Sequence, residues 1–199
     1  MPAIITEIIP KQGFEIVGEQ IGAVLALEVA NQVALQALAN QVGVFHERVT
    51  PFDKSEEVMI NVQLDSGNYD NHTESNVQEG TIFNIDIYAS AASSSGKPGD
   101  LESSKLLQKF LGMCRYILQS TKYRTLALPA GTIGGTYVDS FQIYDQPGPN
   151  EGKSSRMARL VFRVRIYENQ QLWGSTALSG GDTSVKLDLT DKGYKYILT

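Results

Sequence analysis

The segment of this sequence that comes closest to a chemical motif is a glycine-rich run, Gly148-Pro-Asn-Glu-Gly152-Lys153-Ser154. A phosphate-binding P-loop has a related pattern, and it holds phosphate on the backbone N–H groups of its loop and of the helix that follows. Here three residues separate the glycines where the motif has four. The alternating pattern after Ser154 also predicts a strand instead of a helix. We therefore expect no nucleotide and no cofactor.

Side chains that bind metal ions are few and scattered. Neither of the two histidines, His46 and His72, has a second His or Cys at the spacing of a zinc site. Asp65, Asp70 and Glu74 share a polar stretch with His72, but they lack the ordered pattern of a calcium loop. A solvated acidic loop is the preferred interpretation, and we predict no metal site.

Nucleophilic chemistry has equally little support. No Gly-x-Ser-x-Gly turn precedes a predicted helix. The single cysteine, Cys114, falls on the apolar side of a predicted helix, where a buried and unreactive thiol is expected. We predict no catalytic residues and no enzyme activity.

One local basic feature is present, in which Arg159, Arg163 and Arg165 follow Lys153 and Arg156. The preferred interpretation is the solvated face of an antiparallel strand, because isolated surface ion pairs add little stability. The alternative is that these arginines contact acidic side chains of an adjacent subunit, such as those of the 65–79 stretch, which includes Asp70 and Glu74.

The overall composition is that of a folded, single-domain protein. The chain has 199 residues, of which 42% are hydrophobic and 20% charged. Its formal net charge is −5 and no block of Lys or Arg occurs, so tight binding to nucleic acid is not expected. One cysteine allows no internal disulfide, and no secretion signal or membrane-length apolar run is visible. We expect synthesis in the cytoplasm and no membrane partner.

Two segments have the periodicity of helices. Residues 18–40 contain no proline and space their apolar residues by three to five positions. Asn40 and Gly43 are suited to the end of this helix. A second helix begins near Asp100, which can cap it. It carries one apolar stripe, made of Leu107, Phe110, Leu111, Cys114, Ile117 and Leu118.

The remaining elements alternate with the period of strands. Strands are predicted around residues 42–48, 58–64, 83–87, 136–145 and 157–167, with a polar loop at 65–80 and a C-terminal hairpin at 185–198. The fold class is α+β, with a mostly antiparallel sheet flanked by two main helices. We divide the chain into an N-terminal arm (1–17), a core domain (18–170) and a C-terminal extension (171–199).

Part of this core resembles the tail-terminator, or tail-completion, proteins of long-tailed bacteriophages. The resemblance rests on Val44-Phe45-His46-Glu47-Arg48-Val49-Thr50-Pro51-Phe52, on Val58-Met59-Ile60-Asn61-Val62, and on Phe83-Asn84-Ile85-Asp86-Ile87-Tyr88-Ala89. It covers about residues 18–167. It implies a helix, two or three antiparallel strands, a second helix and two further antiparallel strands, and it carries over no catalytic residue.

The resemblance implies a structural protein of the virion. Such a protein forms a homo-oligomeric ring, expected to be a hexamer, on the last ring of the tail tube. Its partners would be the tail tube protein, the neck or head-completion proteins and the terminal ring of the sheath, while DNA passes the channel without specific binding. A head-tail connector ring of the neck and a non-catalytic protein-binding module are the alternatives.

The terminal segments are too apolar to remain in water, so we expect them to contact neighbouring subunits or the neck. The residues predicted for these contacts, together with the acidic and basic residues named above, are Ile4, Ile5, Ile8, Ile9, Asp70, Glu74, Arg159, Arg163, Arg165, Tyr194 and Tyr196.

Overall fold

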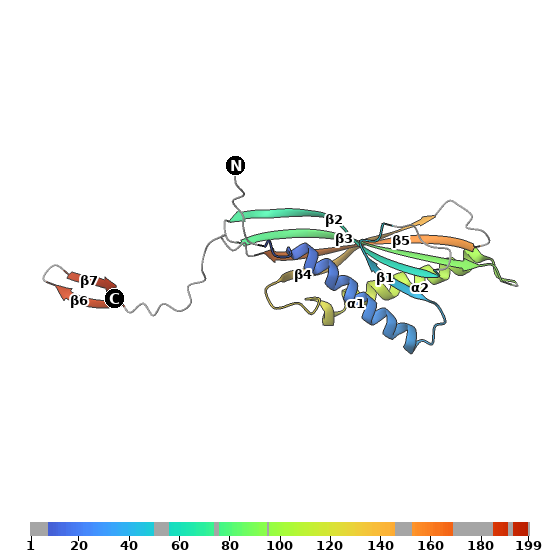
Figure 1. Cartoon of the computed structure of the whole chain (residues 1–199), viewed down its shortest axis with the longest axis horizontal. Helices are drawn as coiled ribbons and strands as arrows, with labels where there is room; N and C mark the ends of the chain where they lie inside the picture. The colour runs from blue at the N-terminus through green and yellow to red at the C-terminus, as the bar shows by residue number, and fades with distance from the viewer. Residues whose placement is uncertain are drawn as a thin grey trace.

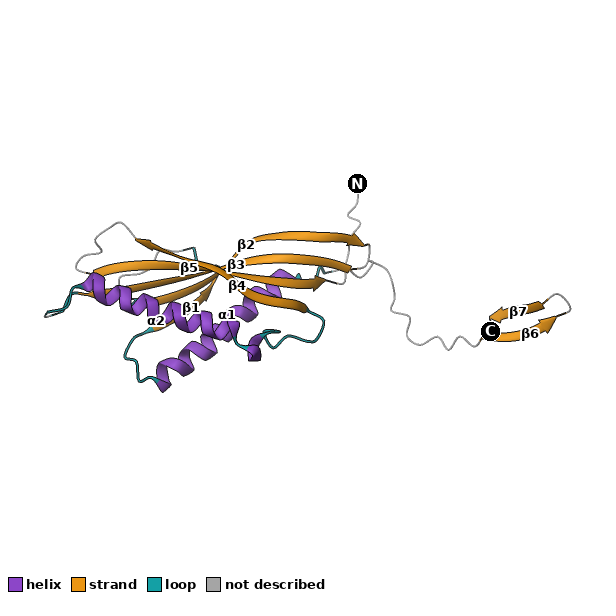
Figure 2. Cartoon of the chain, turned by 180° about the vertical axis from the view of Figure 1, so that it is seen from behind, coloured by secondary structure: helices purple, strands orange, loops and turns teal. Residues whose placement is uncertain are grey.

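The computed structural model describes residues 8–49, 56–73, 76–94, 96–145, 153–168, 185–190 and 193–198. Its main sheet has five strands in the order β1-β2-β3-β5-β4. These strands are β1 (Val42–His46), β2 (Val58–Thr73), β3 (Asn76–Ala92), β4 (Ile133–Asp145) and β5 (Lys153–Glu168). The two helices, α1 (Gly13–Leu35) and α2 (Gly99–Gln119), lie on the same side of this sheet (Figure 1, Figure 2).

The hydrophobic core lies between the sheet and the two helices. α1 packs mainly against β1 and β2, whereas α2 packs against β3 and β5. All six residues of the stripe predicted for α2 are buried, and so are alternate residues of the central strands, including Ile60, Ile85 and Leu160. The predicted α+β class is confirmed, because each strand pattern placed its apolar side chains on one face.

α1 is shifted toward the N-terminus relative to the predicted range of 18–40. It begins at Gly13, where the Glu15 carboxylate accepts a hydrogen bond from the Gln12 backbone N–H at 2.7 Å, as in a capping box. Gly18 therefore lies inside the helix and not at its start. A Cβ at Gly18 would lie 2.7 Å from His46 Nε2, so glycine lets α1 approach β1 closely.

α1 also ends before the predicted Asn40. The N–H groups of Ala37 and Leu38 donate to the carbonyls of Ala34 and Val33, which is the pattern of a Schellman motif. Ala37 has a φ of 49°, in the left-handed region that favours glycine. The sequence did not predict this helix end, because glycine or asparagine, and not alanine, normally occupies this position.

We expect Ala37→Gly to stabilise the protein by about 0.5–1 kcal/mol, because glycine removes the steric cost of positive φ. Part of that gain is offset by the greater freedom of glycine in the unfolded chain. Thermal unfolding of the variant followed by circular dichroism tests this. Ala39→Gly, also exposed but outside the motif, is the control, and equal effects of the two substitutions would contradict the assignment.

α2 begins at Gly99, with Pro98 and not Asp100 at the N-cap position. Asp100 lies in the first turn, where its carboxylate is favoured by the helix dipole and accepts from the Leu101 N–H at 2.9 Å. A Cβ at Gly99 would lie 2.9 Å from the carbonyl oxygen of Ala91. α2 therefore approaches the end of β3 closely at Gly99. Its first residue lies one position before Asp100, the predicted cap.

In the polar stretch predicted as a loop at 65–80, the described residues 65–73 and 76–80 form strand instead. β2 and β3 continue through it as an antiparallel pair, with Tyr69 opposite Glu79 and Asp70 opposite Gln78. β5 pairs with β3 along the same stretch, from Val77 opposite Glu168 onward. Cross-strand hydrogen bonds outweigh the low strand propensity of this polar sequence, and such pairing partners are not visible in a local pattern.

The first strand pair is parallel, whereas the resemblance implied antiparallel strands. Val42 lies opposite Val58 and His46 opposite Val62. Of the connection from β1 to β2, the structure describes residues 47–49 and 56–57. Backbone contacts of Arg48 hold the first part of this connection against the sheet, as described below.

The remaining strand predictions are confirmed. β4 and β5 are antiparallel, with Phe141 opposite Leu160, and the C-terminal hairpin consists of β6 (Val185–Thr190) and β7 (Gly193–Leu198). Its register places Leu187 opposite Tyr196 and Leu189 opposite Tyr194. Among the described helices, neither has the length and hydropathy to cross a membrane.

Candidate interaction surfaces

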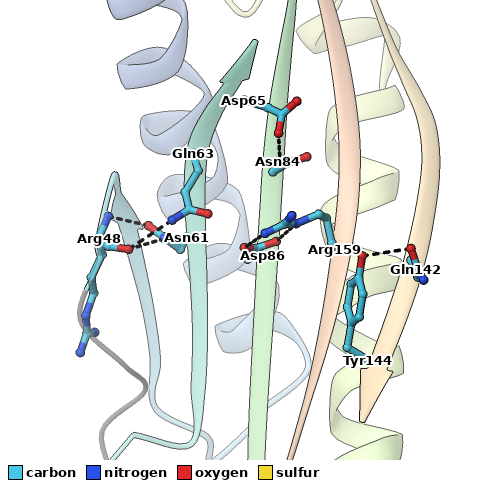
Figure 3. Close-up of polar contacts among 9 residues, drawn as sticks. All are labelled: Arg48, Asn61, Gln63, Asp65, Asn84, Asp86, Gln142, Tyr144 and Arg159. Carbon is cyan, nitrogen blue, oxygen red and sulfur yellow. Dashed lines mark hydrogen bonds and ion pairs between the residues drawn. The ribbon is translucent and has the colours of Figure 1, made fainter. Parts of the chain in front are cut away.

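The sheet face opposite the helices carries a row of polar residues that crosses four strands. In register, Asn61 of β2 lies beside Asp86 of β3, Asp86 beside Arg159 of β5, and Arg159 beside Gln142 of β4. Figure 3 shows this row together with Arg48, Asp65 and Asn84. We call it the polar row.

The centre of the polar row is a bidentate ion pair. Arg159 Nε and one terminal nitrogen donate to the two carboxylate oxygens of Asp86, both at 2.7 Å. The Asp86 side chain is 2% exposed and that of Arg159 is 34% exposed. The hydrogen bonds that Arg159 donates to Asp86 raise the pKa of Arg159, and burial, followed by the charge of Asp86, raises the pKa of Tyr88. The pair holds a buried charge in place within the subunit.

A second cluster joins the segment after β1 to the polar row. The backbone N–H of Arg48 donates to Asn61 Oδ1 at 3.0 Å, and Asn61 Nδ2 donates to the carbonyl of Arg48 at 2.8 Å. The Arg48 guanidinium lies 4.4 Å from the centre of the Phe45 ring and forms an ion pair with Glu56. These contacts cover Asn61, which is buried although it alternates with Ile60 and Val62 and so lies on the sheet face opposite the helices.

The contacts of the polar row hold parts of the subunit together. Within the described residues, no group of three or more His, Cys, Asp or Glu side chains could hold a metal ion. Lys153 is the first residue of β5, so a strand follows the P-loop-like run, as predicted, and its Gly148–Gly152 part lies outside the described residues.

Cys114 is fully buried, and burial raises the pKa of its thiol to about 12. We expect it not to react with a thiol reagent in the native protein at pH 8 and to react fully in denaturant. Because the unfolded thiol ionises near 9 while the folded one keeps its proton to about 12, stability should fall as pH rises above about 9. Titration of the thiol with a chromogenic disulfide, in native buffer and in denaturant, measures the labelling. Rapid labelling of the native protein would contradict the burial of Cys114.

The predicted contact residues lie on several different parts of the structure. Arg159 and Arg163 have acidic partners within the same subunit, Asp86 and Asp139, the latter at 3.2 Å. Arg165 is exposed. Ile8 and Ile9 are 94% and 60% exposed, so they do not pack on their own domain.

Six other predicted contact residues are described in part or not at all. Ile4, Ile5 and Glu74 lie outside the described residues, and Asp70 is described by its backbone pairing in β2. Tyr194 and Tyr196 are placed by their positions in β7. A contact of any of these residues with a neighbouring subunit stays a prediction.

The outer side of α1 is an apolar surface that the sequence analysis did not identify. α1 is hydrophobic on all sides, which is typical of a helix that is covered on all sides. Leu27 and Leu35 are 68% and 72% exposed. We define the α1 patch as these two residues with the exposed residues Ile16, Ala23, Ala30 and Ala34.

A second apolar surface lies on β4, at the opposite edge of the sheet from β1. Phe141 and Ile143 are 51% and 42% exposed, although they lie opposite the buried residues Leu160 and Ala158. Tyr137 and Tyr144 are also exposed and lie on the other face of the same strand. We define the β4 patch as Phe141 and Ile143, which share one face of the strand.

A groove of about 540 Å³ runs between α1 and α2 beside the α1 patch. Asn31 and Gln32 of α1 line one wall, and Met113 and Tyr116 of α2 line the other. Tyr123 also lines the groove and donates a hydrogen bond from its hydroxyl to Glu28, which raises the pKa of Tyr123.

Comparison with known proteins gives distant structural similarities, of which one is described here. Neither a protein family model nor a curated protein sequence matches this chain. A solved structure described as the virion of a native gene transfer agent particle contains a chain that is similar over 74% of this chain and 94% of its own length, with 14% identity and a TM-score of 0.41. Neither fold nor function is inferred from a similarity of this degree.

Proposed function

We propose that this chain is a structural protein of a phage-like virion that assembles into a ring of identical subunits, caps the tail tube and joins it to the neck. The observation that carries the proposal is a pair of exposed apolar patches, one on the helix that packs over β1 and β2 and one on β4, the edge strand at the other end of the sheet. Apolar surface of this kind marks protein interaction sites. Two different patches on one subunit are what a closed ring of head-to-tail contacts requires.

The segments that carry the sequence resemblance support the same proposal. Residues 44–48 form the end of β1 and the start of the segment that covers the polar row, and Arg48 is its central contact. The segments at 58–62 and 83–89 form paired parts of β2 and β3. Among the quoted residues, those that the structure describes in β1, β2 and β3 therefore lie side by side in the fold.

Negative-stain microscopy of the purified protein, alone and mixed with tail tubes of its own phage, tests the proposal. We expect rings, or caps at one end of each tube, and tubes that stop growing when capped. Particles that bind head-side neck proteins and ignore tubes would instead identify a head-tail connector. Single particles that bind neither would contradict a virion role and favour a protein-binding module.

A further inference from the structure

We propose that residues 121–128 form a strap that two tertiary contacts hold closed against the helices, and that this strap opens as a unit while the rest of the fold stays intact. The strap follows α2 in the chain and begins with the 3-10 helix η1 (Thr121–Tyr123). The inference concerns the single subunit, so it goes beyond the proposed function and holds whether or not the chain forms a ring.

The strap contains a turn whose residue types are unsuited to its backbone. Leu126 and Ala127 have φ angles of 51° and 57°. The Leu128 N–H donates to the Thr125 carbonyl at 2.9 Å, across these two residues. Two positive φ angles inside such a hydrogen bond are the pattern of a type I′ turn, which normally takes Asn-Gly or Gly-Gly. Left-handed backbone is unfavourable at leucine and at alanine, so the local sequence opposes this turn.

The first contact that offsets this cost is the burial of Leu126. Its side chain has no exposed surface and belongs to the hydrophobic core, whereas Ala127 is exposed. Tyr123 and Leu128, on either side of the turn, pack partly against the same core. Because a leucine has no local advantage in a left-handed turn, packing of its side chain holds the turn in place. Without that packing the strap would relax to other conformations.

The second contact is the hydrogen bond from the Tyr123 hydroxyl to the Glu28 carboxylate of α1. It joins residues that are 95 positions apart, so it ties the strap to a helix at the other end of the chain. The strap cannot leave the helices unless this bond breaks. Loss of the bond should therefore shift the strap toward its open state by the free energy that the bond contributes.

Opening of the strap changes the groove between α1 and α2. Lys122 and Tyr123 of the strap line this groove together with Glu28 and other residues of the two helices. In the open state these two side chains leave the lining, and Leu126 leaves the core that it covers in the closed state. The strap therefore gives one subunit two different surfaces at the same place, which a binding partner can select between.

Amide hydrogen exchange of the full-length protein measures the opening. The N–H groups of Tyr123, Leu126 and Leu128 all donate to backbone carbonyls, so they exchange when these bonds open. We expect protection factors at Leu126 and Leu128 at least about tenfold below those at Leu111 and Cys114 in α2. Equal protection in the strap and in α2 would mean that the strap opens only with the whole fold, and would overturn the inference.

Two substitutions should shift the opening in opposite directions. Tyr123→Phe removes the hydrogen bond to Glu28 and should lower protection at Leu126 and Leu128 about tenfold, with no change in α2. Ala127→Gly removes a steric cost of the closed turn and should raise protection about threefold, since the greater freedom of glycine in the open strap offsets part of the gain. Protection factors already correct for the faster intrinsic exchange next to glycine.

Each variant has a matched control, and circular dichroism checks that all four fold. Tyr116→Phe alters a tyrosine that lines the same groove and is 80% exposed. Ala130→Gly alters an exposed alanine of the same connection whose φ is not positive. If Tyr123→Phe lowered protection no more than Tyr116→Phe, the contact with Glu28 would not hold the strap. If Ala127→Gly lowered protection as Ala130→Gly does, the turn would not be strained. Either result overturns the proposal.

Discussion

Replacement of Arg159 by methionine is expected to lower the free energy of unfolding by about 3 kcal/mol, because it leaves the Asp86 carboxylate buried without a partner. Asp86 is 2% exposed and has both oxygens paired with Arg159. Breaking a buried pair from one side costs about 3–5 kcal/mol, and the partial exposure of Arg159 places the effect at the lower end. Urea unfolding of the variant measures it.

Arg163→Met is the matched control for this experiment. Arg163 is on the same strand and pairs with Asp139, but both side chains are about 40% exposed. Its loss should cost less than about 1 kcal/mol, as is usual for surface pairs. The double variant Asp86→Leu with Arg159→Met removes both charges and should recover most of the stability. If Arg159→Met cost no more than Arg163→Met, Asp86 would not be a buried charge that depends on its partner.

Replacement of Phe162 by alanine is expected to cost about 3–5 kcal/mol, because it removes a large side chain from the centre of the core. Phe162 lies opposite Phe83 on β3 and opposite Val138 on β4, and both phenylalanines have no exposed surface. Neighbouring strands hold the backbone on both sides, so the core cannot collapse into the space. Phe162→Leu should cost much less, since most of the volume remains.

The control for the core substitution is Phe141→Ala, which removes the same side chain from the β4 patch. At protein concentrations where the chain is monomeric, it should change the free energy of unfolding by less than about 1 kcal/mol, because half of that side chain is already in water. Urea unfolding of both variants separates the two roles. Equal costs would mean that β4 is part of the subunit core and not a docking surface.

Local sequence pattern was sufficient to predict which residues of α2 and β3 are buried. In α2, each of the six predicted stripe residues is buried, because a helix repeats every 3.6 residues and its buried face can be read from spacing. The alternation in β3 likewise separated Phe83 and Ile85 from Asn84 and Asp86. These properties follow from the geometry of one element.

The pairing of residues within the polar row could not be predicted from local pattern, although the residues themselves were recognised in the sequence. Asp86 and the three arginines were all assigned to one face of their strands. That Arg159 neutralises Asp86 depends on β5 lying between β3 and β4, which is a matter of strand order. The partner of Asp86 is 73 residues away in the sequence, and no local signal connects them.

The sequence by itself determined the fold class, the buried faces of α2 and of the central strands, the antiparallel pairing of β4 with β5, and the burial of Cys114. These depend on periodicity, which local chain geometry imposes. Tertiary structure alone decided that β1 is parallel to β2, that the 65–80 stretch forms strand, and that Arg159 pairs inside its own subunit. It also decided that α1 and β4 leave apolar surface at opposite edges, because exposure depends on which elements pack together and not on the order of residues within any one of them.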